Sequence, residues 1–193
     1  MDVKFVQGDP VKEDILMRAN VTEATGVFIL AKDPGNPSSD EKTFAIGTII
    51  EMIEREINKP IRTVVEMVSK DNMKMMQRSR VDGIVSSDGI MDGLLVQEFL
   101  NPGVHDIVHQ ILTNSEGSQF HIMETELNGR KISELQIALL KHPAALQLIG
   151  IVRNGASTLS PKPDMIIDEN DRIIVLAENR KDYLDVEKDL LKM

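Results

Sequence analysis

The chain has 193 residues, of which 41% are hydrophobic and 3% aromatic; it contains no cysteine and carries a formal net charge of −9 at pH 7. The absence of cysteine excludes disulfides and thiolate metal sites, and the acidic balance argues against a nucleic-acid partner. No apolar run approaches the roughly 20 residues that a membrane-spanning helix needs, so we expect no direct membrane insertion.

The opening stretch predicts a strand, a turn and a short helix. Residues 3–6 (VKFV) are typical of a short apolar strand, which runs into the turn at residues 8–10. Pro10 favours the first turn of a helix, and Asp9 is placed so that its side chain caps that helix, which we expect to end at Asn20.

The next apolar run lies at residues 26–31 (GVFILA). A continuous apolar run of this length is typical of a strand that is covered on both faces of a parallel sheet. Residues 32–37 (KDPGNP) then break the chain at the carboxyl end of that strand. In open α/β sheets this edge is where ligands bind, so we expect the ligand site there.

Helices and strands then alternate as far as residue 100. Spacing and β-branched content predict a helix at 40–57 capped by Ser39 or Asp40, a strand at 61–68, a short helix at 71–80 capped by Asp71, a strand at 83–86 and a helix from 87 to 100.

Two consecutive amphipathic helices are predicted around the turn at residues 101–103 (NPG), the second helix covering 104–113. The two apolar faces together are more than is needed to cover a single sheet. We therefore expect a helix-turn-helix crossover that forms the main dimer contact, through Leu95, Phe99, Val104, Ile107, Val108 and Ile111.

The composition changes at residues 114–118 (NSEGS), and shorter elements follow. They are a strand at 119–125, a helix at 132–140, a strand at 146–153, a Pro-containing turn at 160–164, a strand at 172–177 and a helix at 180–192. The predicted fold class is therefore α/β, with a parallel sheet followed by a smaller α+β C-terminal lobe.

The opening stretch, read as V-x-F-V-x-G-D-P, an acidic helix and A-N-V-x-x-A-x-G-V-F-I-L-A, resembles the middle of an RCK domain (regulator of conductance of potassium). Residues 62–66, 81–86 and 94–102 agree in the same order. The run P-x-P-D-x-x-I-x-x-x-D-R-I-I-V is similar to the TrkA-C-like lobe that follows RCK and Trk-type domains. The resemblance implies an RCK N-lobe at 1–100, a crossover and linker at 101–117 and a C-terminal lobe at 118–193.

The resemblance also implies a function. RCK domains are cytosolic, ligand-sensing gating modules of potassium channels, so we expect a cytoplasmic location at the inner face of the membrane and a homodimer or larger ring that acts on a channel pore. The alternative is a soluble, nucleotide-binding subunit of a Trk- or Ktr-type transporter. An enzyme is the third alternative, which we do not expect because no nucleophile or acid–base set emerges.

The dinucleotide fingerprint GxGxxG is missing from the chain. In RCK domains it precedes the point where this sequence begins, so the resemblance implies a Rossmann-like sheet without its first two strands. In the strand order 3-2-1-4-5-6 the strands at 3–6 and 26–31 are then not neighbours, and two edges stay unpaired. A rearranged sheet that pairs them directly is the alternative.

The resemblance places Asp9, Ala31 and Asp33 at the ligand-binding edge, with a nucleotide (NAD or ADP) or Ca²⁺ as candidate effectors. The residues themselves also allow Asp9 to be only a helix cap.

Glu66 matches a calcium-binding carboxylate of RCK channels, and Asp40 and Glu41 are candidate partners for it around a metal ion. The two other carboxylates of that family site are replaced by Leu30 and Val68. Because Ca²⁺ takes six to eight oxygen ligands, the alternative is that these carboxylates cap helices or form ion pairs.

Overall fold

The computed structural model describes residues 3–86, 88–113 and 117–192. The chain divides into two compact units, Met1–Phe99 and Leu100–Met193. The expected crossover segment at 101–117 belongs to the second unit. Each unit has its own core, so each is described by itself.

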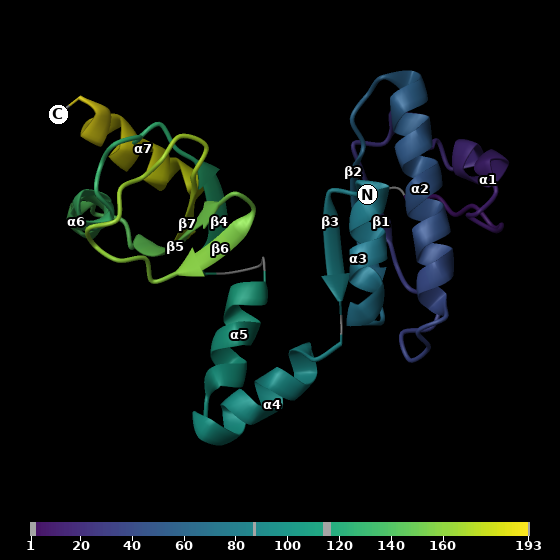
Figure 1. The fold of residues 1–193 in the computed structure, drawn as a ribbon, viewed down its shortest axis with the longest axis horizontal. Helices are drawn as coiled ribbons and strands as arrows, with labels where there is room; N and C mark the ends of the chain where they lie inside the picture. The colour runs from purple at the N-terminus through teal and green to yellow at the C-terminus, as the bar shows by residue number, and fades with distance from the viewer. Residues whose placement is uncertain (1–2, 87, 114–116, 193) are drawn as a thin grey trace. The chain divides into compact units, whose positions relative to one another are not determined.

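The first unit is built on a parallel sheet of three strands in the order β1-β2-β3 (Figure 1). Its elements are α1 (Glu13–Arg18), the 3₁₀ helix η1 (Val21–Glu23), β1 (Gly26–Ile29), α2 (Ser39–Ile57), β2 (Arg62–Met67), η2 (Lys70–Asn72), α3 (Met73–Met76), η3 (Gln77–Ser79), β3 (Gly83–Ser86) and α4 (Ile90–Leu100), whose last residue falls beyond the unit boundary.

Alternate side chains of each strand point to opposite faces of the sheet. One of these faces packs on helices. The helix α2 packs along β1 and β2, and α3 packs against β3. Ile29, Val65 and Met67 lie in the resulting core. The opposite face carries Phe28, which pairs in register with Val64 and is 78% exposed.

The strand expected at residues 3–6 does not form. Val3 to Val6 lie outside the sheet, and Phe5 is 87% exposed. Among the described residues the only strand that pairs with β1 is β2, so one edge of β1 stays unpaired, and the rearranged sheet is not what forms. The physical reason is that a short extended segment is stable as a strand only beside another strand that satisfies its backbone groups.

The predicted helix caps are also corrected. Asp9 accepts a hydrogen bond from the amide of Val11, within the turn before α1, whose own N-cap Lys12 forms no side-chain cap. No side chain caps α2, in which Ser39 and Asp40 are the first two residues. Ser69, not Asp71, caps the segment after β2, since its hydroxyl accepts from the Asp71 amide at 3.3 Å. For Asp40 the physical reason is long-range: its carboxylate accepts from the amides of Val68 and Ser69 rather than from its own helix.

The second unit contains an antiparallel sheet in the order β4-β7-β5-β6. Its elements are α5 (Val104–Leu112), β4 (Gln119–Glu124), α6 (Ile132–Lys141), β5 (Gln147–Arg153), β6 (Ala156–Leu159), β7 (Arg172–Ala177) and α7 (Arg180–Leu191). The expected α/β unit followed by an α+β lobe is therefore confirmed.

Strand β6 is absent from the prediction, although the sequence carries a signal for it. Asn154 and Gly155, both with positive φ, form a two-residue turn between Arg153 and Ala156, which pair across the hairpin. Asn-Gly is the preferred pair for such a turn because both central residues need φ > 0.

The core of the second unit lies between its sheet and helices α6 and α7. Tyr183 of α7 is fully buried, and its hydroxyl donates to Glu187 at 3.3 Å. Glu187 also accepts from the Thr125 hydroxyl at 2.6 Å, so the polar groups in this core are paired.

Candidate functional site

The carboxyl edge of the parallel sheet is held together by a carboxylate from β2. The backbone amide of Ala31 donates to Glu66 Oε2 at 2.9 Å. The contact exists because β1 and β2 are parallel neighbours, so the residues that follow β1 lie beside the end of β2. Glu66 thus acts as an internal hydrogen-bond acceptor at the place where we expected a metal ligand.

Asp40 has a similar role from the first turn of α2. Its buried carboxylate accepts from the amides of Val68 at 2.7 Å and Ser69 at 3.0 Å, and from the side-chain amide of Asn72 at 2.8 Å. These donors all follow β2. The carboxylate therefore joins the start of α2 to the loop after β2.

The remaining predicted residues lie around the loop between β1 and α2. Asp33 Oδ1 accepts from the Gly35 amide at 3.1 Å. The backbone amide of Asp33 donates to the Ser39 hydroxyl, and that hydroxyl donates to the backbone carbonyl of Asp33. Glu41 is exposed on α2. Within the described part of the chain, no three acidic or histidine side chains gather as a metal site, so Glu66, Asp40 and Glu41 are not brought together as a ligand set.

A cavity of about 260 Å³ opens at this edge. It lies between the turn at residues 8–10, the end of β1 and the first turns of α2. Its lining residues are Gly8, Pro10, Leu30, Lys32, Ser39, Lys42, Thr43 and Ile46. The predicted ligand-binding residues Asp9, Ala31 and Asp33 are next to these in the chain, but they do not line the cavity themselves.

Asp9 contacts a residue of the cavity wall. Its carboxylate forms an ion pair with the Lys42 ammonium at 2.8 Å. The hydrogen bond from Lys42, followed by that from the Val11 amide, lowers the pKa of Asp9 below its usual value. Neither Lys32 nor Lys42 was predicted as a site residue. No sequence motif identifies them, because only the fold places these two lysines beside the cavity.

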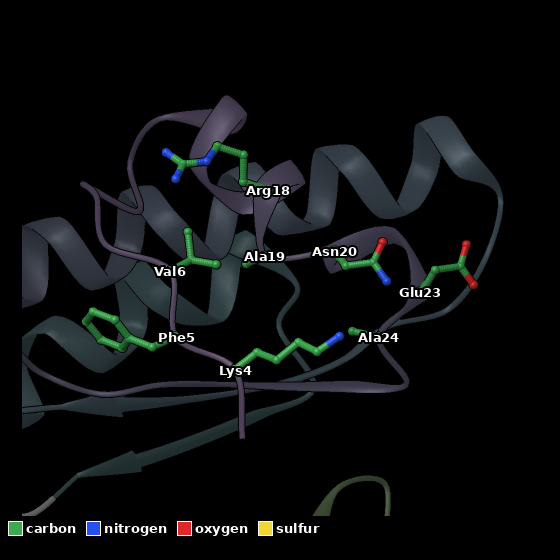
Figure 2. A pocket seen from close by; sticks show the side chains of 8 residues that line it. All are labelled: Lys4, Phe5, Val6, Arg18, Ala19, Asn20, Glu23 and Ala24. Atoms are coloured by element: carbon green, nitrogen blue, oxygen red, sulfur yellow. The ribbon is translucent and has the colours of Figure 1, made fainter. Parts of the chain in front are cut away.

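A second hollow, of about 1060 Å³, lies beside the extended segment at residues 4–6. Figure 2 shows this segment running past the residues that end α1 and form η1, with Arg18, Asn20 and Glu23 along the opposite side. None of the predicted ligand residues lines it.

The predicted dimer residues are solvent-accessible. Leu95 and Phe99 on α4 are exposed, Phe99 at 85%, and no residue of α4 is buried. On α5, Ile107 is exposed, while Val104, Val108 and Ile111 are half-buried. Both helices therefore present apolar side chains to solvent in the single chain.

The acidic turn before β7 is joined to the hairpin. Arg153 of β5 pairs with the buried Asp171 carboxylate, with Nη2 at 2.7 Å from Oδ2, and Nη1 lies 2.8 Å from Asp168 Oδ2. Sequence spacing does not reveal this contact, because Arg153 ends strand β5 whereas Asp168 and Asp171 lie in the turn before β7, 15 and 18 residues further along the chain.

Comparison with known proteins gives two family matches. The Castor and Pollux model, described as part of voltage-gated ion channel, matches residues 88–191, and the TrkA-N domain model matches residues 1–87. Together they cover both units of the fold. They confirm the predicted resemblance to RCK and Trk-type domains of potassium channels.

Individual relatives agree with these matches. POLLUX of Arabidopsis thaliana is 26% identical over 181 residues, which is 91% of this chain and 21% of the relative. The calcium-gated potassium channel TvoK of Thermoplasma volcanium is 23% identical over 185 residues, covering 94% of this chain and 52% of TvoK. The chain thus spans about a fifth of POLLUX and about half of TvoK.

A solved structure shares the fold. The human SLO3 gating ring aligns with a TM-score of 0.70 at 19% identity, covering 96% of this chain and 38% of the other. Across residues 3–86, 88–113 and 117–192, no helix combines the length and the apolar character that crossing a membrane requires. Because the Castor and Pollux model matches more than half of its residues, this chain belongs to the Castor and Pollux family of ion-channel domains.

Proposed function

We propose that this chain is a ligand-sensing, non-catalytic regulatory module of a potassium channel, located in the cytoplasm at the inner face of the membrane. A family match to ion-channel domains over more than half of the chain supports this. A ligand that binds one conformation more tightly shifts the equilibrium between conformations, and its differential affinity sets how far the gate moves.

The observation that carries the proposal is the exposed apolar surface of α4 and α5. Apolar side chains on two successive helices, with Phe99 85% exposed, are costly in a monomer and are typical of a contact surface. Ring assembly covers such a surface and gives each module a neighbour through which movement is transmitted. We therefore propose a homodimer or larger ring built through these helices.

The oligomeric state tests the proposal. Replacing Ile107 and Ile111 with Asp places unpaired charges in the apolar contact, so light scattering is expected to report a monomer. Gln110→Asp is the matched control, since it adds a charge to the same helix outside the apolar face, and it leaves the assembly intact. A double variant that assembles like the unmodified chain rules out this contact.

A second candidate function is supported by the match of residues 1–87 to the TrkA-N domain. The chain would then serve as a soluble nucleotide-binding subunit of a Trk- or Ktr-type transporter. The reading frame around the coding sequence separates the two candidates. A pore signature of the Thr-Val-Gly type in the same frame supports the channel, and its absence supports the separate subunit.

The effector is proposed from the same edge of the sheet, with a nucleotide or Ca²⁺ as the candidate classes. The relative TvoK is a calcium-gated potassium channel. In this chain, however, Glu66 and Asp40 already accept hydrogen bonds from backbone amides. The two other positions that carry calcium-binding carboxylates in the family hold Leu30 and Val68 here. We therefore favour an effector other than calcium at this edge.

A further inference from the structure

Helix α5 carries two histidines that are one turn apart. His105 and His109 are spaced i, i+4, so they lie on the same face of the helix. Their ring centroids are 6.2 Å apart, the ring planes are inclined by 30°, and both residues are exposed. Two histidines at this spacing bind Zn²⁺ on the helix of an H-E-x-x-H motif, and the run here is H-D-x-x-H.

The separation of the two rings is close to what chelation requires. Zinc–nitrogen bonds are about 2.0–2.1 Å long, so two imidazoles on one tetrahedral ion have their centroids roughly 5 Å apart. Starting from 6.2 Å, the rings need to approach each other by about 1 Å. The His105 side chain is 60% exposed, so a change of its side-chain torsions achieves this without movement of the helix backbone.

Asp106 places a carboxylate beside the first histidine. His105 Nδ1 lies 3.3 Å from Asp106 Oδ1. A histidine that binds a metal commonly donates its other ring N–H to a carboxylate, which fixes the tautomer and the orientation of the ring. With Nδ1 engaged in this way, Nε2 is the atom of His105 that is available to a metal ion.

The other two histidines of the chain have roles in the fold. His121 Nε2 lies 3.2 Å from the carbonyl oxygen of Ala177, and His142 Nδ1 accepts from the Ala144 amide at 3.2 Å. Among the residues that the structure describes, no group of three or more histidine, aspartate or glutamate side chains could hold a metal ion. A metal ion on α5 therefore has two protein ligands, with water in its remaining positions.

We propose that His105 and His109 chelate a divalent transition-metal ion such as Zn²⁺ through their Nε2 atoms, with Asp106 orienting His105. This inference goes beyond the regulatory function proposed above and does not depend on it. Imidazole suits Zn²⁺, Cu²⁺ and Ni²⁺, whereas Mg²⁺ and Ca²⁺ prefer oxygen ligands. The site therefore differs in both metal class and position from the carboxylates at the edge of the parallel sheet.

Chelation is expected to stabilise α5. The helix has nine residues, none of which is buried, and a helix this short is marginal without tertiary packing. The two imidazoles reach one ion only when the turn between them is helical, so the metal binds the helical conformation and raises its population. The metal thus orders the helix that carries Ile107 and Ile111 of the proposed contact surface.

Calorimetric titration of the whole chain with Zn²⁺ tests the site. His105→Asn and His109→Asn are each expected to weaken binding about 100-fold, because joining two ligands on one scaffold gains at least that factor over a single ligand. Asp106→Asn is expected to weaken binding about 10-fold, as for loss of an orienting carboxylate.

Two control variants separate chelation from the mere presence of histidine. The double variant His109→Gln and Gln110→His keeps two histidines on α5 but moves the second one off the shared face, and we expect it to bind as weakly as His109→Asn. His142→Gln removes a histidine outside α5 and leaves the affinity unchanged. Circular dichroism verifies that each variant is folded.

Hydrogen exchange provides a second readout at the helix itself. Zn²⁺ is expected to slow the exchange of the α5 amides in the unmodified chain and to leave it unchanged in His109→Asn. Exchange that Zn²⁺ does not slow in the unmodified chain rejects the stabilisation of α5.

Several calorimetric results overturn the proposal. Zn²⁺ binding that is unchanged in His105→Asn or His109→Asn places the ion elsewhere, and equal binding by the variant with altered spacing rejects chelation. Unchanged affinity in Asp106→Asn rejects the orienting carboxylate. Displacement of Zn²⁺ by millimolar Ca²⁺ identifies oxygen ligands in place of imidazole.

Discussion

Asp40 offers the sharpest test of how the carboxyl edge of the parallel sheet is held in place. We predict that Asp40→Asn strongly destabilises the first unit, although the two side chains have nearly the same shape. The carboxylate accepts three hydrogen bonds, from Val68, Ser69 and Asn72. An asparagine retains one oxygen acceptor and turns an N–H donor toward groups that are donors themselves.

The magnitude follows from these contacts. Each hydrogen bond to a charged acceptor contributes about 1.5–3 kcal/mol, and contributions within one network are not additive. The amides of Val68 and Ser69 are only half-buried, so water satisfies part of what is lost. We therefore expect a loss of about 3 kcal/mol, a large share of the roughly 5–15 kcal/mol by which a domain is stable.

Urea unfolding followed by far-ultraviolet circular dichroism measures this loss. With a denaturant dependence of about 1–3 kcal/mol per molar urea, the midpoint is expected to fall by about 1–3 M. Hydrogen exchange gives the local readout, because the amides of Val68 and Ser69 lose their protection. Glu41→Gln, a charge removal at the next and exposed position of α2, is the control.

One result refutes the reasoning directly. If Asp40→Asn unfolds within about 0.5 kcal/mol of the unmodified chain, the range of ordinary surface substitutions, the carboxylate does not hold the loop after β2. Unchanged protection of the Val68 and Ser69 amides leads to the same conclusion. The only tyrosine, Tyr183, lies in the other unit, so its fluorescence reports whether the effect stays within the first unit.

Three further predictions follow from the same contacts. Millimolar Ca²⁺ is expected to raise the melting temperature little, because Glu66 already accepts the Ala31 amide; a large rise that disappears in Glu66→Gln would identify Glu66 as a calcium ligand after all. Residues 1–193 are expected to bind NAD weakly or not at all in calorimetry, because the sequence lacks the glycine-rich turn that cradles a pyrophosphate; tight binding contradicts this. Burial raises the pKa of Glu51, and repulsion from Glu54 and Asp82 adds to this effect. The folded chain therefore holds the proton of Glu51 more tightly than the unfolded chain does. The stability contributed by protonated Glu51 is then complete below the unfolded pKa of about 4.3 and is lost as pH rises through the folded pKa. Glu51→Gln should accordingly gain stability relative to the unmodified chain between pH 4 and pH 7 in urea unfolding, and a difference that does not change with pH contradicts this.

Local sequence signals determined most of the elements. The strand Gly83–Ser86 lies at the predicted residues. Helix α2 ends at Ile57 because the next residue, Asn58, takes a left-handed conformation. The hairpin at Asn154–Gly155 was not predicted, although the Asn-Gly pair is a local signal of the same kind. Such features depend on neighbouring residues along the chain, which is why the sequence alone contains them.

Tertiary structure alone decided the roles of the charged side chains. Asp40 was expected to cap its own helix, yet it binds amides 28 and 29 residues away, and Glu66 binds an amide 35 residues away. Residues 3–6 have the composition of a strand, but strand formation needs a neighbouring strand that satisfies the backbone. Partners distant in sequence become neighbours only when parallel strands bring their carboxyl ends to one edge, so spacing along the chain cannot identify them.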